Sequence, residues 1–269
     1  MACGRAKHIA ATLALAVCAF AVLMLAGCTE APEAASNAED VAAITTESET
    51  SAAAVGGADE RDSAGGYIEY MGQASVKVVT PEGKVIYIDP YAGSDYGDAA
   101  DLILSTHAHF DHRAFDLVST RNSDCVTITE LESIASDGTH NVFDLGFAKV
   151  TPVQAGFNRM HDVGSCVGYV IELTDGTRIY VTGDTSTTDD MRDGTLAAMG
   201  IDYAFWCSDG VYNMDTAEAS TAAEMVGAKV NIPYHNSTSN QGDMFDADLA
   251  RSFNGPNALV LTPGEKIEL

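Results

Sequence analysis

Basic residues are scarce in this sequence. Its 269 residues include 14 lysines and arginines against 39 aspartates and glutamates, which gives a formal net charge of −25. Residues 66–269 alone carry −19 of this charge. A domain with this charge repels phosphate backbones, so DNA and RNA are excluded as expected partners. We expect a small-molecule substrate, and the sequence sets no oligomeric state.

Long apolar runs are absent apart from one near the N-terminus. Residues 9–27 contain a single polar side chain, Thr12, and follow Arg5 and Lys7. This order of charge and apolar run is typical of an export signal, although its length also permits an uncleaved membrane-spanning helix. The closing Leu-Ala-Gly-Cys at 25–28 resembles the lipobox of bacterial lipoproteins, in which the cysteine carries lipid and becomes the mature N-terminus.

The N-terminal pattern therefore predicts a lipoprotein signal peptide over residues 1–27 and a lipidated Cys28. Residues 29–65 hold nine acids against one base, Arg61, and show no sustained apolar period, which predicts a disordered tether over 28–65. As a flexible coil this tether would reach about 33 Å. We expect a protein exported and anchored through lipid to the outside of the cell membrane, with a catalytic domain over 66–269.

Cysteine is also sparse. Of six in the chain, Cys125, Cys166 and Cys207 lie in the expected domain. Three is an odd number, so at least one thiol stays free.

The whole chain is 46% hydrophobic, as a packed core requires. The pattern of the expected domain mixes strands and helices. Residues 81–84 and Asp175-Gly176 are expected hairpin turns. Helices are expected near 113–120, 189–199 and 216–227. Strands are expected over 67–80, 85–91, 101–106, 125–129, 147–154, 168–173, 178–184, 201–206 and 229–233, with a final pair within 259–269. The mixture predicts a layered α/β domain.

The most informative segment is 106–112, which reads Thr-His-Ala-His-Phe-Asp-His directly after an expected buried strand. In an extended chain His107 and His109 project to the same side, and a following turn brings Asp111 and His112 to a second position. Four ligand-type side chains in six residues can serve two adjacent ions. Imidazole and carboxylate donors suit two divalent ions, Zn²⁺ first and Mn²⁺ or Fe²⁺ as alternatives.

This His-x-His-x-Asp-His motif resembles the signature of metallo-β-lactamase-fold hydrolases. The resemblance extends over 67–269 and is greatest to the branch of ascorbate-6-phosphate lactonase-like proteins, through the segments around 70–78, 87–91, 100–112, 168–172, 178–185 and 232–235. It implies a four-layer αββα sandwich with the metals at one edge.

The same resemblance implies the remaining ligands. Asp184, in Gly-Asp-Thr after an expected strand, would bridge both ions, and His235, after Ile-Pro-Tyr, would bind the second. For the third ligand of the first ion two histidines compete, His161 and His140. His161 lies where the branch has a histidine before its Gly-Tyr strand, although Asp162 replaces the usual proline, whereas His140 lies in a polar turn.

The expected first site is therefore His107, His109 and His161, and the second is Asp111, His112 and His235, with Asp184 shared. A hydroxide held between two such ions is a nucleophile at neutral pH. We expect Asp111 to carry the proton to the leaving group. Cys207 is expected as a buried structural thiol. A further group of residues next to the motifs is either pocket lining or ordinary loop: Tyr212, Asn213, Tyr234 and Asn236.

Three functions remain open. The first is a dinuclear hydrolase that acts on an ester, lactone, phosphoester or amide at the cell surface. The second is a non-catalytic zinc-binding lipoprotein, which would need one closed site rather than two open ones. The third is a diiron protein that handles oxygen, which is disfavoured because such proteins usually have glutamate where His109 stands; a β-lactam substrate has little support.

Overall fold

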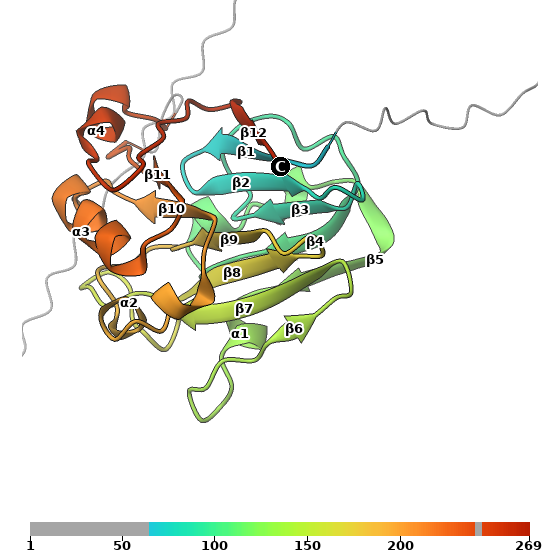
Figure 1. Ribbon diagram of the computed structural model, residues 1–269. Coiled ribbons are helices and arrows are strands. Elements are labelled where there is room, and N and C mark those ends of the chain that lie inside the picture. Colours follow the sequence, from blue (N-terminus) through green and yellow to red (C-terminus); the bar gives the residue numbers. More distant parts are fainter. Residues whose placement is uncertain (1–64, 240–243) are drawn as a thin grey trace, which may run out of the picture. The chain divides into compact units, whose positions relative to one another are not determined.

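The computed structural model describes residues 65–239 and 244–269 (Figure 1). The predicted signal peptide, the lipidated Cys28 and the tether as far as residue 64 lie outside the described residues. No helix within the described ranges is long and apolar enough to cross a membrane.

Two six-stranded sheets make up the domain. The first has the order β12-β1-β2-β3-β4-β5. Its strands are β1 (Tyr67–Gly72), β2 (Ser75–Val79), β3 (Val85–Ile88), β4 (Ala100–Leu104), β5 (Arg121–Ile128) and β12 (Lys266–Glu268). β12, β1, β2 and β3 pair antiparallel with one another in that order, whereas β4 is parallel to both β3 and β5.

The second sheet has the order β11-β10-β9-β8-β7-β6. Its strands are β6 (Phe143–Asp144), β7 (Ala148–Gln154), β8 (Val167–Leu173), β9 (Arg178–Val181), β10 (Tyr203–Cys207) and β11 (Val230–Tyr234). β6 to β9 form antiparallel pairs, and β9, β10 and β11 are mutually parallel. The carboxyl ends of these three parallel strands therefore lie at one edge of the sheet, where their following residues can meet.

The core follows from the period-2 alternation of the strands. In β3, Ile86 and Ile88 belong to the main apolar cluster, which also contains residues of the second sheet, whereas Val85 and Tyr87 belong to a smaller cluster. β4 divides in the same way, with Leu102 and Leu104 in the main cluster. The central strands β3 and β4 of the first sheet are thus buried on both faces, because successive side chains point to opposite sides.

Different structures cover the two outer faces. On the second sheet, α3 (Thr216–Val226) packs on β10 and β11, α2 (Asp189–Arg192) contacts β7, and α4 (Ala247–Ser252) packs on α3 (Figure 1). On the first sheet, the smaller cluster is completed by Tyr96, Phe115 and Val118. These residues come from loops and from the short 3-10 turn at Phe115–Leu117, so no long helix among the described residues forms this fourth layer.

The α/β sandwich predicted from the sequence is confirmed, but several local elements differ from the expectation. The helix expected near 113–120 is wrong, because two 3-10 turns, Phe110–His112 and Phe115–Leu117, lead directly into β5. The helix expected over 189–199 is broken after Arg192, where Gly194 has a φ of +86°. The strand pair expected within 259–269 is a single strand, β12.

The turn at 81–84 and the turn at Asp175-Gly176 form as expected, the first between β2 and β3 and the second between β8 and β9. The first expected strand, 67–80, is divided by a turn at Gln73 into β1 and β2. α1 (Glu130–Ser133), a single turn of helix after β5, was not expected.

The close packing of β8 and β9 makes Gly168 a sensitive position. A Cβ there would lie 2.9 Å from the carbonyl oxygen of Val181 and 3.0 Å from that of Thr182. Gly168→Ala should therefore lower the free energy of unfolding by about 1–3 kcal/mol, measured by denaturant titration. Gly97→Ala is the matched control, because a Cβ at Gly97 meets nothing within 4 Å. Equal stability of the two variants would contradict this packing.

Candidate metal centre

The candidate site lies where strands of both sheets end. β4 is followed by the segment that holds His107, His109, Asp111 and His112. From the second sheet, Asp184 follows β9 after two residues. Two further histidines complete the group: His235, the residue after β11, and His161, on the loop between β7 and β8. The parallel order of β9, β10 and β11 brings residues that are far apart in sequence to the same edge.

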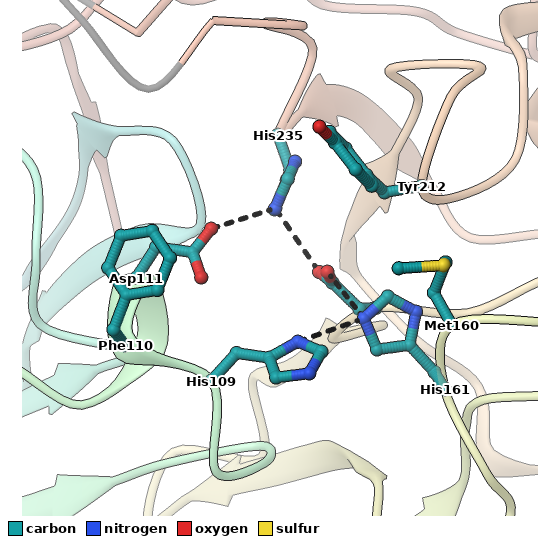
Figure 2. Close-up of a pocket in the computed structure, with 8 residues that line it drawn as sticks. His109, Phe110, Asp111, Met160, His161, Tyr212 and His235 are labelled. Atoms are coloured by element: carbon teal, nitrogen blue, oxygen red, sulfur yellow. Dashed lines mark hydrogen bonds and ion pairs between the residues drawn. The ribbon is translucent and has the colours of Figure 1, made fainter. Parts of the chain in front are cut away.

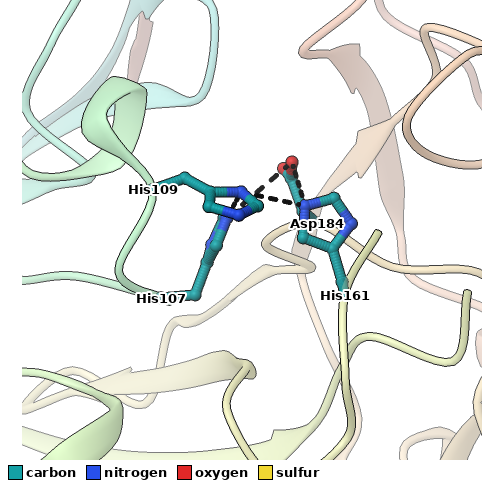
Figure 3. A group of neighbouring side chains, drawn as sticks. All are labelled: His107, His109, His161 and Asp184. Atoms are coloured by element: carbon teal, nitrogen blue, oxygen red, sulfur yellow. Dashed lines mark hydrogen bonds and ion pairs between the residues drawn. The ribbon is translucent and has the colours of Figure 1, made fainter. Parts of the chain in front are cut away.

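Four side chains form the first cluster: His107, His109, His161 and Asp184 (Figure 3). Nδ1 of His109 lies 2.9 Å from Nε2 of His107 and 3.2 Å from Nε2 of His161. The Asp184 Oδ2 atom lies 3.2 Å from His161 Nε2 and 4.0 Å from His107 Nε2. Three imidazole nitrogens and one carboxylate oxygen therefore converge on one point.

Three side chains form the second cluster: Asp111, His112 and His235. Here Asp184 contributes its other oxygen, Oδ1, which lies 3.3 Å from His112 Nε2 and 3.4 Å from His235 Nε2. The Asp111 Oδ2 atom lies 3.9 Å from His112 Nε2 and 3.8 Å from His235 Nε2. One carboxylate thus faces both clusters, with one oxygen toward each.

The donor set fits divalent ions. His112 Nε2 and Asp184 Oδ1 are both buried, and neither has a hydrogen-bond partner among the described residues, although they lie 3.3 Å apart. Leaving such atoms unsatisfied costs free energy, so buried polar atoms of this kind indicate a group that binds between them. Two ions bound to imidazole nitrogens and carboxylate oxygens would supply these missing partners.

Three residues that the sequence interpretation missed orient the histidine rings from outside. Asp89 Oδ2 lies 2.8 Å from His112 Nδ1 and accepts a hydrogen bond of 2.8 Å from the Thr106 hydroxyl. Asp209 Oδ2 lies 3.3 Å from His235 Nδ1, and Asn158 Oδ1 lies 3.1 Å from His161 Nδ1. A hydrogen bond to an oxygen at Nδ1, as at His112 and His161, fixes the tautomer that leaves the Nε2 lone pair for an ion. The available signal was position, because Asp89 and Asp209 follow β3 and β10 closely.

The electrostatics differ between the clusters. Burial would lower the pKa of His112, but Asp184 and Asp89 outweigh it and hold that pKa well above its usual value. For His235, Asp184 and Asp209 likewise overcome burial and raise the pKa. Burial, reinforced by the charge of His112, lowers the pKa of His107 far below its usual value.

The same charges shift the pKa of the Asp184 carboxyl group. Burial opposes its charge, yet His235 and His112 hold the pKa of its carboxyl well below the usual range. In the metal-free protein the raised pKa values of His112 and His235 let protons compete with an ion at the second cluster. An ion that enters the second cluster has to displace these protons, so metal binding there weakens as the pH falls.

A cavity of about 240 Å³ opens onto both clusters (Figure 2). Its polar wall is made of cluster residues: His109, Asp111, His161, Asp184 and His235. The remaining lining residues are Phe110, Met160 and Tyr212, which are 64%, 52% and 41% exposed. None of the lining residues is a lysine or an arginine. The cavity therefore combines a metal-binding floor with an apolar rim.

The structure places the other sequence candidates as follows. His140 pairs with Ile134 in an isolated β-bridge and lies outside both clusters, so His161 is the histidine that joins the first. Cys207 is buried, outside both clusters, and burial raises the pKa of its thiol. The three cysteines of the described residues are all free.

Of the four residues next to the motifs, Tyr212 alone lines the cavity. The hydroxyl of Tyr234 accepts a hydrogen bond of 3.0 Å from the backbone of Gly183 and so supports the Asp184 turn. The side chain of Asn213 donates a hydrogen bond to Asp209. The side chain of Asn236 accepts one from the backbone amide of Asp246.

Comparison with known proteins agrees with this fold and site. The family model described as a beta-lactamase superfamily domain matches residues 67–235. Together with the two six-stranded sheets, this match defines a metallo-β-lactamase-superfamily protein.

A UPF0173 metal-dependent hydrolase of Rubrobacter xylanophilus is 32% identical over 200 residues, which cover 64% of this chain and 81% of that protein. The chain belongs to the UPF0173 metal-dependent hydrolase family, and it is a metal-dependent hydrolase of the metallo-β-lactamase superfamily.

Solved structures show the same fold. A metallo hydrolase from the archaeon Ignicoccus hospitalis superposes with a TM-score of 0.55 at 23% identity, and covers 76% of this chain and 98% of its own. An isothiocyanate hydrolase from Delia radicum gut bacteria gives a TM-score of 0.54 at 18% identity, with coverage of 75% and 98%. At these identities the likeness concerns the fold.

The geometry predicts different roles for the two competing histidines. His161→Ala removes one of three neutral donors from the first cluster, so we expect zinc content to fall from about two ions per chain toward one, with loss of most turnover. His140→Ala is the matched control and should keep both. Metal content is measured by elemental analysis after each variant has shown a wild-type circular dichroism spectrum. Loss of metal from folded His140→Ala alone would overturn the assignment.

Proposed function

We propose that this protein is a dinuclear hydrolase that cleaves an ester, lactone, phosphoester or amide bond of a small molecule. The observation that carries the proposal is the position of Asp184, whose two oxygens face two separate groups of histidines. A single closed metal site would not need a shared carboxylate. The cavity that opens onto both clusters also argues against the alternative of a non-catalytic zinc-binding lipoprotein, because structural and storage sites are closed to ligands.

When bound, two divalent ions lower the pKa of water to about 7 and polarise a carbonyl or phosphoryl oxygen. The chain's own residues hold those ions at the floor of the cavity and orient the substrate above it. Asp111 lines the cavity and remains 9% exposed, so its carboxylate can reach a substrate atom. We assign it the transfer of a proton to the leaving group.

The rim of the cavity suggests which substrates fit. The ring of Phe110 is held edge-on by Tyr91, with centroids 5.6 Å apart, and Met160 and Tyr212 supply further apolar surface. A substrate with an apolar group next to the scissile bond would bury that group against the rim. The resemblance to lactonase-like proteins supports a lactone as one candidate within this class.

We further propose that the protein acts outside the cell, anchored through Cys28. The support is the sequence alone: Arg5 and Lys7, the apolar run at 9–27, and Leu-Ala-Gly-Cys at 25–28. A lipid on Cys28, followed by the acidic tether, would hold the catalytic domain near the membrane surface.

The first test is hydrolysis by the full chain loaded with Zn²⁺ or Mn²⁺. The panel consists of nitrophenyl esters of increasing acyl length, lactones and a nitrophenyl phosphodiester. At least one should be cleaved, with activity lost on chelation and restored by metal. Asp111→Asn should lower kcat by about 10²–10⁴-fold, as expected for loss of a general acid. A chain that holds two ions and cleaves nothing on the panel would contradict the proposal.

The same assay tests whether the apolar rim of the cavity selects substrates by acyl length. Phe110→Ala should raise KM for the longer acyl esters more than for the acetyl ester, because it removes apolar contact surface. Leu131→Ala is the control, since Leu131 is also exposed, at 74%, but does not line the cavity. Equal effects of Phe110→Ala on all chain lengths would refute a role of the rim in selectivity.

Lipid attachment has its own test. In cells grown with a fatty-acid probe, the wild-type chain should be labelled and Cys28→Ser should not, because the acyl chain is attached through this cysteine. Cys125→Ser, which alters a cysteine of the folded domain, serves as the control and should be labelled like the wild type. Equal labelling of Cys28→Ser would exclude lipidation at this site.

A further inference from the structure

Gln73 is a polar residue beside the second cluster to which the sequence analysis assigned no role. It lies in the turn between β1 and β2 and is 1% exposed. Its Nε2 atom lies 3.2 Å from Asp111 Oδ2 and 3.2 Å from His235 Nε2. The backbone is involved as well, because the carbonyl oxygen of Gln73 accepts a hydrogen bond of 2.8 Å from the His235 amide.

Packing does not explain a glutamine at this position. The Oε1 atom of Gln73 is buried and has no hydrogen-bond partner among the described residues, which is a cost that an apolar side chain of similar shape would avoid. The backbone of Gln73 is also unfavourable, with a φ of +48° in the left-handed region that favours glycine. Unfavourable conformations of this kind persist mostly at functional sites.

The hydrogen bond that Gln73 donates to Asp111 accounts for the unsatisfied Oε1 atom and the unfavourable backbone conformation of Gln73. Within residues 65–239 and 244–269, it is the one hydrogen bond that the Asp111 carboxylate accepts. His112 and His235 lie nearly 4 Å from the same oxygen and do not fix its direction. An Asp111 side chain without the Gln73 donor could rotate away from the cluster toward the open cavity.

We propose that Gln73 is a positioning residue of the second metal site, which aims the Asp111 carboxylate at the ion by donating a hydrogen bond to Oδ2. The lone pair of an amide nitrogen is delocalised into the carbonyl group, so Nε2 of Gln73 acts as a hydrogen-bond donor and not as a metal ligand, and the effect passes through Asp111. Ligating carboxylates are commonly held by such outer donors. The inference rests on the proposed dinuclear function.

The test measures metal affinity rather than turnover. The metal-free full chain is titrated with Zn²⁺ by calorimetry, which separates the first and second equivalents. Gln73→Met keeps the size of the side chain and removes the donor. It should weaken binding of the second equivalent by about 10–100-fold and leave the first unchanged. Gln154→Met is the matched control, because the Gln154 side chain accepts from the backbone of Asp190 and is not part of either cluster.

A double-mutant cycle tests the path through Asp111. Asp111→Ala removes the acceptor, so in that background Gln73→Met should weaken the second equivalent by less than about twofold more. A wild-type circular dichroism spectrum of each variant shows that it is folded before affinity is compared.

The outcomes separate the two hypotheses. Unchanged second-site affinity in Gln73→Met overturns the inference and leaves the dinuclear function standing. An undiminished effect of Gln73→Met in the Asp111→Ala background also overturns it, because Gln73 would then act through His235 rather than through Asp111. A wild-type chain that binds one ion refutes the dinuclear function, and the role of Gln73 fails with it.

Discussion

The sharing of one buried carboxylate between two groups of histidines is the constraint on which the site depends. Asp184 is 3% exposed, and an isolated charge at such a position would be costly. His107 and His112 come from the end of a strand in the first sheet, whereas Asp184 and His235 follow strands of the second. The charge of Asp184 is therefore balanced from both sheets, by His112 of the first and His235 of the second, so that the apolar core between them also sets the geometry of the metal centre.

Backbone strain is concentrated around this carboxylate and its neighbours. Six non-glycine residues of the described chain have positive φ, and four of them contact the site or adjoin a residue that does: Gln73, Asp89, Phe157 and His235. Each such conformation costs on the order of 1–3 kcal/mol. The strands that flank these residues are almost entirely buried, and their packing offsets the cost. The strained loop residues thus lower the stability of the fold, and the packing of the sheets compensates for this loss.

Two carboxylates outside the clusters, Asp89 and Asp209, each contact one histidine of the second cluster. Asp89 orients His112 from the first sheet and Asp209 orients His235 from the second. Asp209 also accepts hydrogen bonds from the backbone amides of Val211 and Tyr212, which form the loop beside the cavity. One side chain therefore links the position of a histidine in the second cluster to the loop that carries Tyr212. This link connects the metal floor of the cavity to its apolar rim.

The sequence predicted the fold class, most strands and six of the seven residues of the two clusters, and it favoured His161 over His140 for the seventh. The sequence indicated four of these residues because the motif at 107–112 places four donors within six residues, whereas it indicated Asp184 and His235 through the family resemblance of segments 178–185 and 232–235. It failed where local pattern is weak, as at 113–120, where short 3-10 turns replace a helix, and at 259–269.

Only the tertiary structure decided which residues act together across the chain. The pairing of Gln73 with Asp111, of Asp89 with His112 and of Asp209 with His235 joins residues 23 to 38 positions apart, in different loops. Sequence order also left His140 and His161 as alternatives. A periodic pattern reports on the neighbours of a residue along one strand, whereas these contacts arise from how the strand ends converge when the two sheets pack together.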